Sequence, residues 1–169
     1  MRKLVVTSIA LCAAIITSQA IAQAPPAPAP APSPPPAYGE TINLEQAKKA
    51  AAAAQDFAAK NGWAMAITVV GPSGDLVYFQ KMDNTQFASI VIAQHKARAA
   101  ATFRRPTKVF EDRIATPAGV PALTLDGVIA SEGGIPIVIG GKIVGAMGCS
   151  GGTGQQDGMA CQAGVNAVK

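Results

Sequence analysis

The sequence predicts an α/β domain of the α+β type, in which helices cover an antiparallel sheet of about five strands. Two pairs of apolar, strand-like runs are each joined by a short glycine-containing turn, a pattern typical of β-hairpins. Alanine-rich helical segments lie before, between and after these hairpins, at both ends of the domain and in its centre. The expected order is therefore helix, hairpin, helix, hairpin, helix.

Local signals mark the first helix and the first hairpin. Asn43 can cap a helix over residues 44–60, with Gln46 completing a capping box and Asn61-Gly62 ending the helix. The inner face of this helix is mostly alanine, so it can pack closely against a sheet. The strand-like runs WAMAITVV and LVYFQKM follow, and the turn GPSGD joins them into a hairpin.

The second half of the domain repeats this arrangement. A long helix is predicted over residues 87–103, because FASIVIAQHKARAAATF ends at an Arg-Arg-Pro sequence. TKVFEDRI is expected to be a short helix, and residues 115–127, with two prolines and a central glycine, a loop. GIPIVIGGKIVGAMGC predicts the second hairpin around the turn Gly140-Gly141, and QQDGMACQAGVNAV the last helix.

The N-terminus has the pattern of an export signal. MRK precedes the apolar run LVVTSIALCAAII, and the small-x-small sequence Ala-Ile-Ala ends at Ala22. This run is too short to span a bilayer, so we expect no stable membrane insertion. Residues 1–22 are therefore predicted to be a signal peptide, and the mature protein to be secreted or periplasmic.

A proline-rich segment follows the predicted signal peptide. Eight prolines occur between Pro25 and Pro36, and proline fixes φ and removes a hydrogen-bond donor. We expect residues 23–39 to be a disordered, extended Pro/Ala-rich linker; a ligand for a proline-binding partner is the alternative. Residues 40–169 remain as one domain, long enough to bury a hydrophobic core.

Charge and cysteine content exclude some functions. The formal net charge is +4, and signal-peptide removal takes away Arg2 and Lys3. We therefore expect no nucleic-acid partner. Cys149 and Cys161 could form a disulfide in an oxidising compartment, or both could remain buried thiols. No CxxC motif occurs, so the sequence predicts no zinc knuckle.

The stretch GCSGG resembles the turn that presents a nucleophilic serine in hydrolases. An α/β-hydrolase needs a histidine after that serine, whereas the only histidine, His95, precedes Ser150. A protease-type order of histidine, acid and serine is available, but so small a domain cannot easily build the two barrels of such a protease. We therefore expect a structural role for Ser150.

The same glycine-rich turn could bind an anion. Gly151, Gly152 and Thr153 lie where a strand ends and a helix begins, and N–H groups at such a junction can hold a carboxylate. The alternative is a turn whose N–H groups are satisfied internally, through Asp157, or that packs against another subunit. Both interpretations fit the sequence.

Three stretches carry the most specific pattern in the chain: MAITVVGPSGDLVYFQKMDN, HKARAAATFRRPT and EGGIPIVIGGKIVGAMGCSGGTGQQD. Together they resemble the GlcG/HbpS-type haem-binding family, which is related to the C-terminal domain of the PduO cobalamin proteins. The likeness covers nearly all of residues 41–169. It implies a mixed sheet-and-helix domain that forms oligomers. Exported members of that family bind haem, and some are described as haem-degrading or as partners of membrane sensor kinases.

This resemblance makes His95 the candidate axial ligand of a haem iron. On a helix it shares a face with Val91, Arg98 and Thr102, so a nitrogen ligand, an apolar wall and a cation for a propionate would lie together. The alternative is a solvent-facing or intersubunit histidine. The D/E-x-x-E iron motif of some relatives is absent here, and His95 cannot be matched to their haem-binding histidines.

Further cations follow this histidine. Lys96, Arg98 and Arg105 are predicted to bind haem propionates or another acidic ligand. The alternative is that they are cations placed favourably near the C-terminal end of a helix.

We therefore expect an exported protein that binds haem or another anionic small molecule non-covalently, in haem scavenging, storage or sensing, and that forms a homo-oligomer. A binding protein is favoured over an enzyme. One alternative is an enzyme of the same fold acting on haem or a small carboxylated metabolite. The other is a ligand-free oligomeric scaffold or the partner of a membrane sensor protein.

Overall fold

The computed structural model describes residues 34–169, so the predicted signal peptide and most of the predicted linker lie outside the described residues. The elements in chain order are β1 (Ala37–Tyr38), α1 (Leu44–Lys60), β2 (Ala66–Val70), β3 (Leu76–Lys81), α2 (Ala88–Thr102), α3 (Lys108–Ile114), the 3-10 helix η1 (Pro117–Thr124), β4 (Gly134–Ile139), β5 (Lys142–Ser150) and α4 (Gly154–Asn166). Within residues 34–169, no helix is long and apolar enough to cross a membrane.

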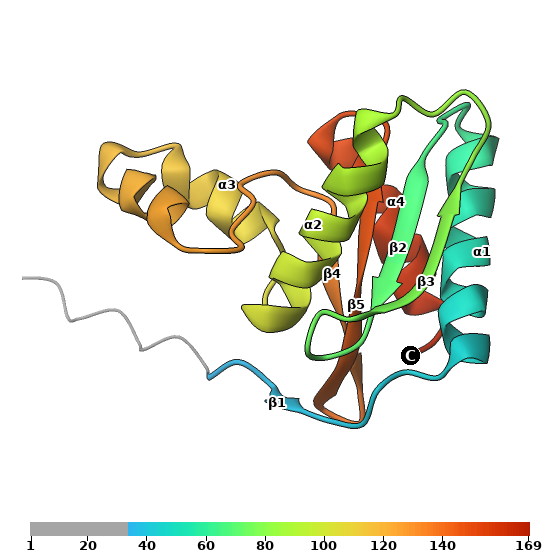
Figure 1. Cartoon of the computed structure of the whole chain (residues 1–169), viewed down its shortest axis with the longest axis horizontal. Coiled ribbons are helices and arrows are strands. Elements are labelled where there is room, and N and C mark those ends of the chain that lie inside the picture. The colour runs from blue at the N-terminus through green and yellow to red at the C-terminus, as the bar shows by residue number, and fades with distance from the viewer. Residues whose placement is uncertain (1–33) are drawn as a thin grey trace, which may run out of the picture. The chain divides into compact units, whose positions relative to one another are not determined.

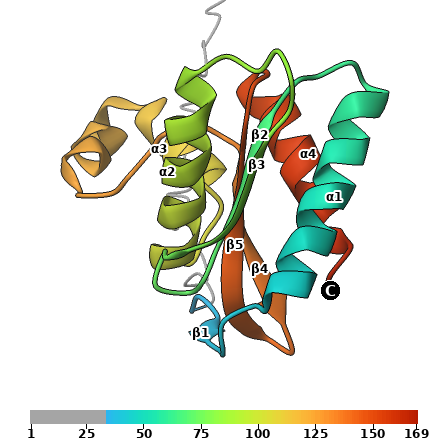
Figure 2. The same cartoon turned by 45° about the vertical axis from the view of Figure 1, so that its right-hand side comes forward.

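The strands form one sheet between two layers of helices. Strands β4, β5, β2 and β3 are antiparallel neighbours in that order, and the short β1 pairs in parallel with β5. Helix α2 covers one face of the sheet, and α1 and α4 cover the other (Figure 1, Figure 2). The predicted fold class is confirmed, with two hairpins, terminal helices and a central helix.

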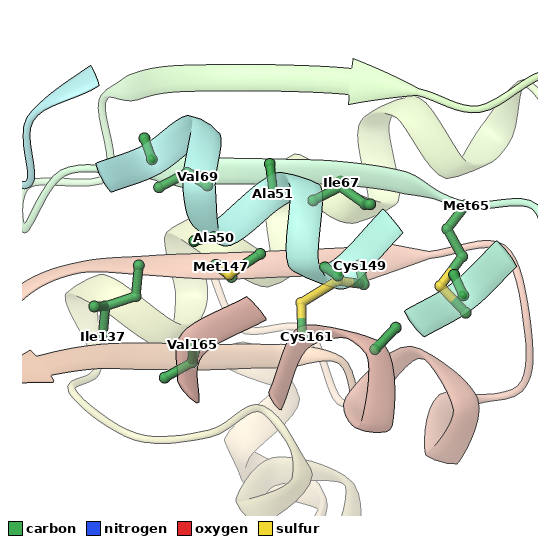
Figure 3. Packing of buried hydrophobic residues seen from close by; sticks show 14 of the residues in the cluster. Ala50, Ala51, Met65, Ile67, Val69, Ile137, Met147, Cys149, Cys161 and Val165 are labelled. Atoms are coloured by element: carbon green, nitrogen blue, oxygen red, sulfur yellow. A yellow bond between two sulfur atoms is a disulfide. The ribbon is translucent and has the colours of Figure 1, made fainter. Parts of the chain in front are cut away.

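The main hydrophobic core lies between the sheet and the α1–α4 layer. Ile67, Val69 and Met147 enter it from β2 and β5 and are fully buried (Figure 3). Small residues bring the two helices close together, since a Cβ on Gly164 would stand 2.6 Å from the carbonyl oxygen of Ala50. Burial of this apolar surface, at about 25 cal/mol per Å², is the main source of stability.

Helix α2 lies directly on the opposite face of the sheet. A Cβ on Gly148 of β5 would come within 2.0 Å of the carbonyl oxygen of Ala93, so only glycine permits this approach. Ala97 of α2 packs beside it. Thr68 of β2 is completely buried, and its hydroxyl has no hydrogen-bond partner among the described residues.

The local signals in the sequence are confirmed. The Asn43 side chain accepts a hydrogen bond from the Gln46 N–H at 2.9 Å, and the Gln46 side chain completes the capping box. Gly62, just after α1, has a φ of 72°. Gly140 and Gly141 have φ values of 56° and 76°, the positive values that a two-residue hairpin turn requires.

The segment expected to be a loop, residues 115–127, contains a helix. Residues Pro117–Thr124 form η1, and Pro117 is its first residue. Proline suits this place because its φ is already helical and its missing N–H would have had no partner in the first turn. Pro117 therefore marks the start of a short helix in a segment that lacks apolar periodicity, whereas Pro121 lies inside that helix.

Strand β1 lies within the predicted linker, residues 23–39. Ala37 and Tyr38 pair with β5, and the Tyr38 hydroxyl donates to the carbonyl oxygen of Thr102 at 2.9 Å, at the end of α2. Arg104 stacks over the Tyr38 ring, with 5.4 Å between its guanidinium carbon and the ring centroid. The end of the predicted linker is therefore part of the folded domain, which begins before residue 40.

Candidate functional site

A hollow of about 300 Å³ opens on the outer face of α2. Its lining residues are Val91, Gln94, His95 and Arg98. These residues are three or four positions apart, so they lie on neighbouring turns of one helix face. The grouping of His95 with Val91 and Arg98, inferred from helical spacing, is therefore present in the structure. Gln94 was not predicted to belong to it.

The packing of α2 explains why this face is open. Ala93 and Ala97 hold the opposite face of the helix against β5, which leaves the face with His95 directed away from the sheet. Val91, which lines the hollow, has a relative exposure of 70%, and Phe87, the N-cap residue of α2 four positions earlier, has one of 83%. Large apolar side chains this exposed are an unusual feature and can indicate a binding surface.

Arg98 is held in place by the β2–β3 turn. Its Nε donates to the carbonyl oxygen of Gly74 at 3.3 Å, and its Cγ would lie 3.4 Å from a Cβ on Gly74. This hydrogen bond uses one of the five N–H donors of the guanidinium. The others can bind an acidic group, and a planar guanidinium can hold a carboxylate with two parallel hydrogen bonds.

Lys96 lies on the other side of the helix, in the interior. Its Nζ stands 2.8 Å from Asp157 Oδ2 of α4, and the two side chains are only 2% and 3% exposed. Burial raises the pKa of Asp157, whereas the hydrogen bond from Lys96 and the N–H group of Gly152 lower it. Lys96 was predicted to bind a haem propionate or another acidic ligand. In the structure its ammonium group is buried and paired with Asp157, so we leave Lys96 out of the candidate site.

The glycine-rich turn uses its own donors. The Gly152 N–H donates to Asp157 Oδ1 and the Thr153 N–H to Gln156 Oε1, each at 2.9 Å. Gly151 packs against the chain at residues 64–65, where a Cβ would stand 2.1 Å from a carbonyl oxygen. These contacts match the alternative of an internally satisfied turn, so we leave Gly151, Gly152 and Thr153 out of the candidate site.

Ser150 is buried beside a second serine. Its hydroxyl donates to Ser89 Oγ at 3.1 Å, which joins the end of β5 to the first turn of α2. This contact agrees with the structural role expected for Ser150.

Arg105 lies beyond the end of α2, where its Nε donates to the carbonyl oxygen of Phe103 at 3.0 Å. It does not line the hollow, unlike Arg98.

Cys149 of β5 and Cys161 of α4 form a disulfide, the first of the two alternatives left open by the sequence. Their Cα atoms are 5.7 Å apart, and both residues are fully buried in the main core (Figure 3). Stable disulfides are typical of proteins in oxidising compartments.

The residues of the hollow fit one side of a haem. They provide one imidazole nitrogen for an axial iron ligand, one guanidinium for a propionate and one apolar side chain, Val91, for contact with a porphyrin ring. In the part of the chain that the structure describes, no group of three or more His, Cys, Asp or Glu side chains could hold a metal ion without a porphyrin.

These features define a class of small α/β domains in which one helix on one face of an antiparallel sheet, and two on the other, enclose the strands. The chain belongs to the family described as "Haem degrading protein HbpS-like", whose pattern it matches over residues 42–166. The resemblance found in the sequence is thereby confirmed.

Individual relatives agree with this assignment. Protein GlcG of Escherichia coli is 37% identical over 110 residues, which are 64% of this chain and 81% of that protein. A solved double mutant of Streptomyces reticuli HbpS has a TM-score of 0.72 at 27% identity, covering 85% of this chain and 99% of that one. The solved PduOC–haem complex shares the fold, with a TM-score of 0.69 at 20% identity, covering 76% of this chain and 96% of that one.

Proposed function

We propose that this domain binds haem non-covalently at the hollow on the outer face of α2. One observation carries the proposal: His95, Arg98 and Val91, which the sequence places on one helix face, line the same hollow. The family assignment and the haem complex of a protein with the same fold support haem as the ligand.

Each lining residue has a separate task in this proposal. Haem supplies an iron that accepts an axial nitrogen ligand, and His95 is the side chain that offers one. Arg98 binds a propionate through the donors that Gly74 leaves free. Val91, with the neighbouring Phe87, covers part of the apolar ring. A volume of about 300 Å³ is at the lower end of the range for ligand sites, so this face covers only part of a haem.

Titration with hemin tests the proposal. The purified protein should give a saturable Soret shift, and His95→Ala should change that spectrum because it removes the axial nitrogen. Arg98→Ala should raise the dissociation constant roughly 10- to 100-fold, the loss of one or two charge-assisted hydrogen bonds. Arg105→Ala is the matched control and should leave binding unchanged, because Arg105 lies away from the hollow.

Two outcomes contradict this site. An unchanged spectrum for His95→Ala would remove His95 as the iron ligand. An Arg105→Ala variant weakened as much as Arg98→Ala would move the propionate to the end of α2. If the wild-type protein shows no Soret shift at all, the proposal of haem binding fails.

Haem degradation is the second candidate, and the description of the family favours it. The two activities are separated by adding a reductant in air to the hemin-loaded protein. A Soret band that disappears with turnover indicates degradation, whereas a persistent band indicates scavenging, storage or sensing. The sequence favours a binding protein over an enzyme, so binding without turnover is the result we expect.

Export completes the proposal. The buried disulfide supports an oxidising compartment, periplasmic or extracellular, after removal of the predicted signal peptide. Mass spectrometry of the mature protein should give an N-terminus after Ala22, and an intact Met1 would contradict export. A homo-oligomer and a membrane sensor partner are further proposals, drawn from the family resemblance.

A further inference from the structure

A second hollow, of about 280 Å³, lies between the start of α3, the start of β4 and the middle of α4. Its lining includes Lys108, Glu132, Ile135, Met159 and Gln162. None of its lining residues belongs to the hollow on the outer face of α2. It is therefore a separate place on the molecule where a ligand can bind.

The carboxyl group of Glu132 lies against α4 because a glycine leaves room for it. A Cβ on Gly158 would stand 2.5 Å from Glu132 Oε1, so a larger residue there would displace the carboxyl group. The main chain of Glu132 is fixed as well, since its N–H donates to Glu111 Oε2 at 2.7 Å. Within residues 34–169, the Glu132 side chain takes part in none of the ion pairs or hydrogen bonds. Its oxygens can therefore accept hydrogen bonds from a ligand.

Gln162 supplies a second hydrogen-bond acceptor to this hollow. Its Nε2 donates to Asn166 Oδ1, one turn later in α4, at 2.8 Å. This bond uses the donor end of the amide, so the carbonyl oxygen is the end that Gln162 can offer to a ligand. The ammonium group of Lys108 is already engaged, because it pairs with Asp112 and lies 3.8 Å from Glu111 Oε1. The hollow thus offers acceptors and lacks a free donor side chain among the described residues.

The charge around the hollow is negative. Among the described residues, the charged side chains in or near it are Glu111, Asp112, Glu132, Asp157, Lys96 and Lys108. Lys96 and Asp157 form a buried pair and cancel, which leaves three acids around Lys108. Burial and then the charge of Glu111 raise the pKa of Glu132, against the opposing effect of the two lysines. A positive charge in the hollow would relieve this excess of acids.

We propose that this hollow is a binding site for a small organic cation with a primary ammonium group and a short apolar chain. An ammonium group carries three N–H donors and no acceptor. Two of them can bind the Glu132 carboxylate and the Gln162 amide oxygen, while the chain packs against Ile135 and Met159. A few convergent polar groups beside apolar side chains are typical of small-molecule sites. The proposal is independent of haem binding.

An anion or a metal ion fits the hollow less well. A carboxylate ligand needs a free cation, whereas Lys108 already has two acidic neighbours. A metal ion needs several protein ligands, and in the described part of the chain no three His, Cys, Asp or Glu side chains are grouped to hold one. Neither ion would use the apolar side chains of Ile135 and Met159.

Three probes of equal chain length test the proposal by ligand-observed NMR titration of the haem-free protein: butylammonium, butanol and butyrate. Butylammonium should bind saturably, and the neutral and anionic probes should bind about tenfold more weakly or worse. Glu132→Gln keeps the side-chain volume but removes the charge, so it should raise the Kd for butylammonium about tenfold or more. Glu45→Gln is the matched control: it makes the same change at an exposed carboxylate of α1 and should leave this Kd unchanged.

Two further effects have a sign that distinguishes a cation site from an anion site. Lys108→Met removes a positive charge beside the hollow, so it should lower the Kd for butylammonium about two- to fivefold. In the wild-type protein the Kd should rise as the pH falls through the pKa of Glu132, because the protonated carboxyl group carries no charge. This pH dependence should be smaller in Glu132→Gln.

Circular dichroism checks that each variant is folded, and the pH series needs only the wild-type protein. The proposal is overturned if butylammonium does not bind saturably, if Glu132→Gln and Glu45→Gln bind it equally well, or if Lys108→Met weakens its binding. Displacement of butylammonium by Ca²⁺ or Mg²⁺, with loss of metal binding in Glu132→Gln, would assign the hollow to a metal ion instead.

Discussion

The buried ion pair between Lys96 and Asp157 should be a major contributor to the integrity of the domain. The two charges are 2.8 Å apart, and their side chains are only 2% and 3% exposed, so water cannot replace a missing partner. Asp157→Asn keeps the volume and can still accept the Gly152 N–H, but it leaves the ammonium group without a counter-charge. We expect the free energy of unfolding to fall by about 3–5 kcal/mol. For a domain of this size the melting temperature should fall by roughly 10–20 °C.

Urea unfolding followed by fluorescence measures this effect, because Trp63 is the only tryptophan and packs against Phe57 in the folded state. Lys48→Met is the matched control: it removes an exposed ion pair with Glu45 and should change stability by less than about 1 kcal/mol. A double variant, Lys96→Met with Asp157→Asn, should recover most of the loss, since no unpaired charge remains and the asparagine still accepts the Gly152 N–H. If Asp157→Asn is no more destabilising than Lys48→Met, the interpretation of a buried, uncompensated charge is wrong.

Three other perturbations have definite expected outcomes. Replacing Cys149 and Cys161 together by alanine should lower the free energy of unfolding by about 3 kcal/mol, because the disulfide no longer closes a loop of 12 residues. A reductant should lower the melting temperature of the wild-type protein but not that of this variant. Thr68→Val should stabilise the domain by about 1 kcal/mol in urea unfolding, because it removes a buried hydroxyl without a partner; a loss of stability would show that this hydroxyl is satisfied. The pKa of Glu132 is raised, first by burial and then by Glu111, so the folded state binds a proton more tightly than the unfolded state. The protonated Glu132 therefore stabilises the fold at pH values below its ordinary pKa, and this stabilisation is lost as the pH rises through the raised pKa. Glu132→Gln should remove this pH dependence of the free energy of unfolding. Equal pH profiles for the variant and the wild-type protein would contradict the prediction.

Elements set by short-range chemistry were predictable from the sequence. The capping box of Asn43 and Gln46 and the glycine pair of the second hairpin each act within a few residues, so their pattern is visible in the chain itself. Strand β1 was missed because two residues after a run of prolines give no periodicity. Its formation depends on pairing with β5, about a hundred residues later in the sequence.

The candidate site was predictable only in part, for the same reason. Helical spacing correctly grouped His95 with Arg98, because both depend on one helix. The same spacing puts Lys96 three residues after Ala93 and four before Ala100, on the alanine face of α2, and this signal favoured burial. The sequence could not identify Asp157 as the partner of Lys96, because the two residues are 61 positions apart. The charge of Asp157 is what makes a buried lysine stable.

The position of α2 on the sheet depends on polar contacts more than on the shape of its apolar face. Alanine side chains packed against glycine residues of β5 form a nearly flat contact surface. Such a surface brings the helix close to the sheet but does not fix its position along its own axis. Directional contacts exist at three levels: Ser89 with Ser150 near the first turn, Lys96 with Asp157 in the middle, and the Tyr38 hydroxyl with the carbonyl of Thr102 at the end. Each has strict distance and angle requirements, so a shift of the helix by one residue would break all three. These contacts on the inner side and at the ends of α2 therefore hold Arg98 beside the β2–β3 turn, with His95 on the same outer face of the helix.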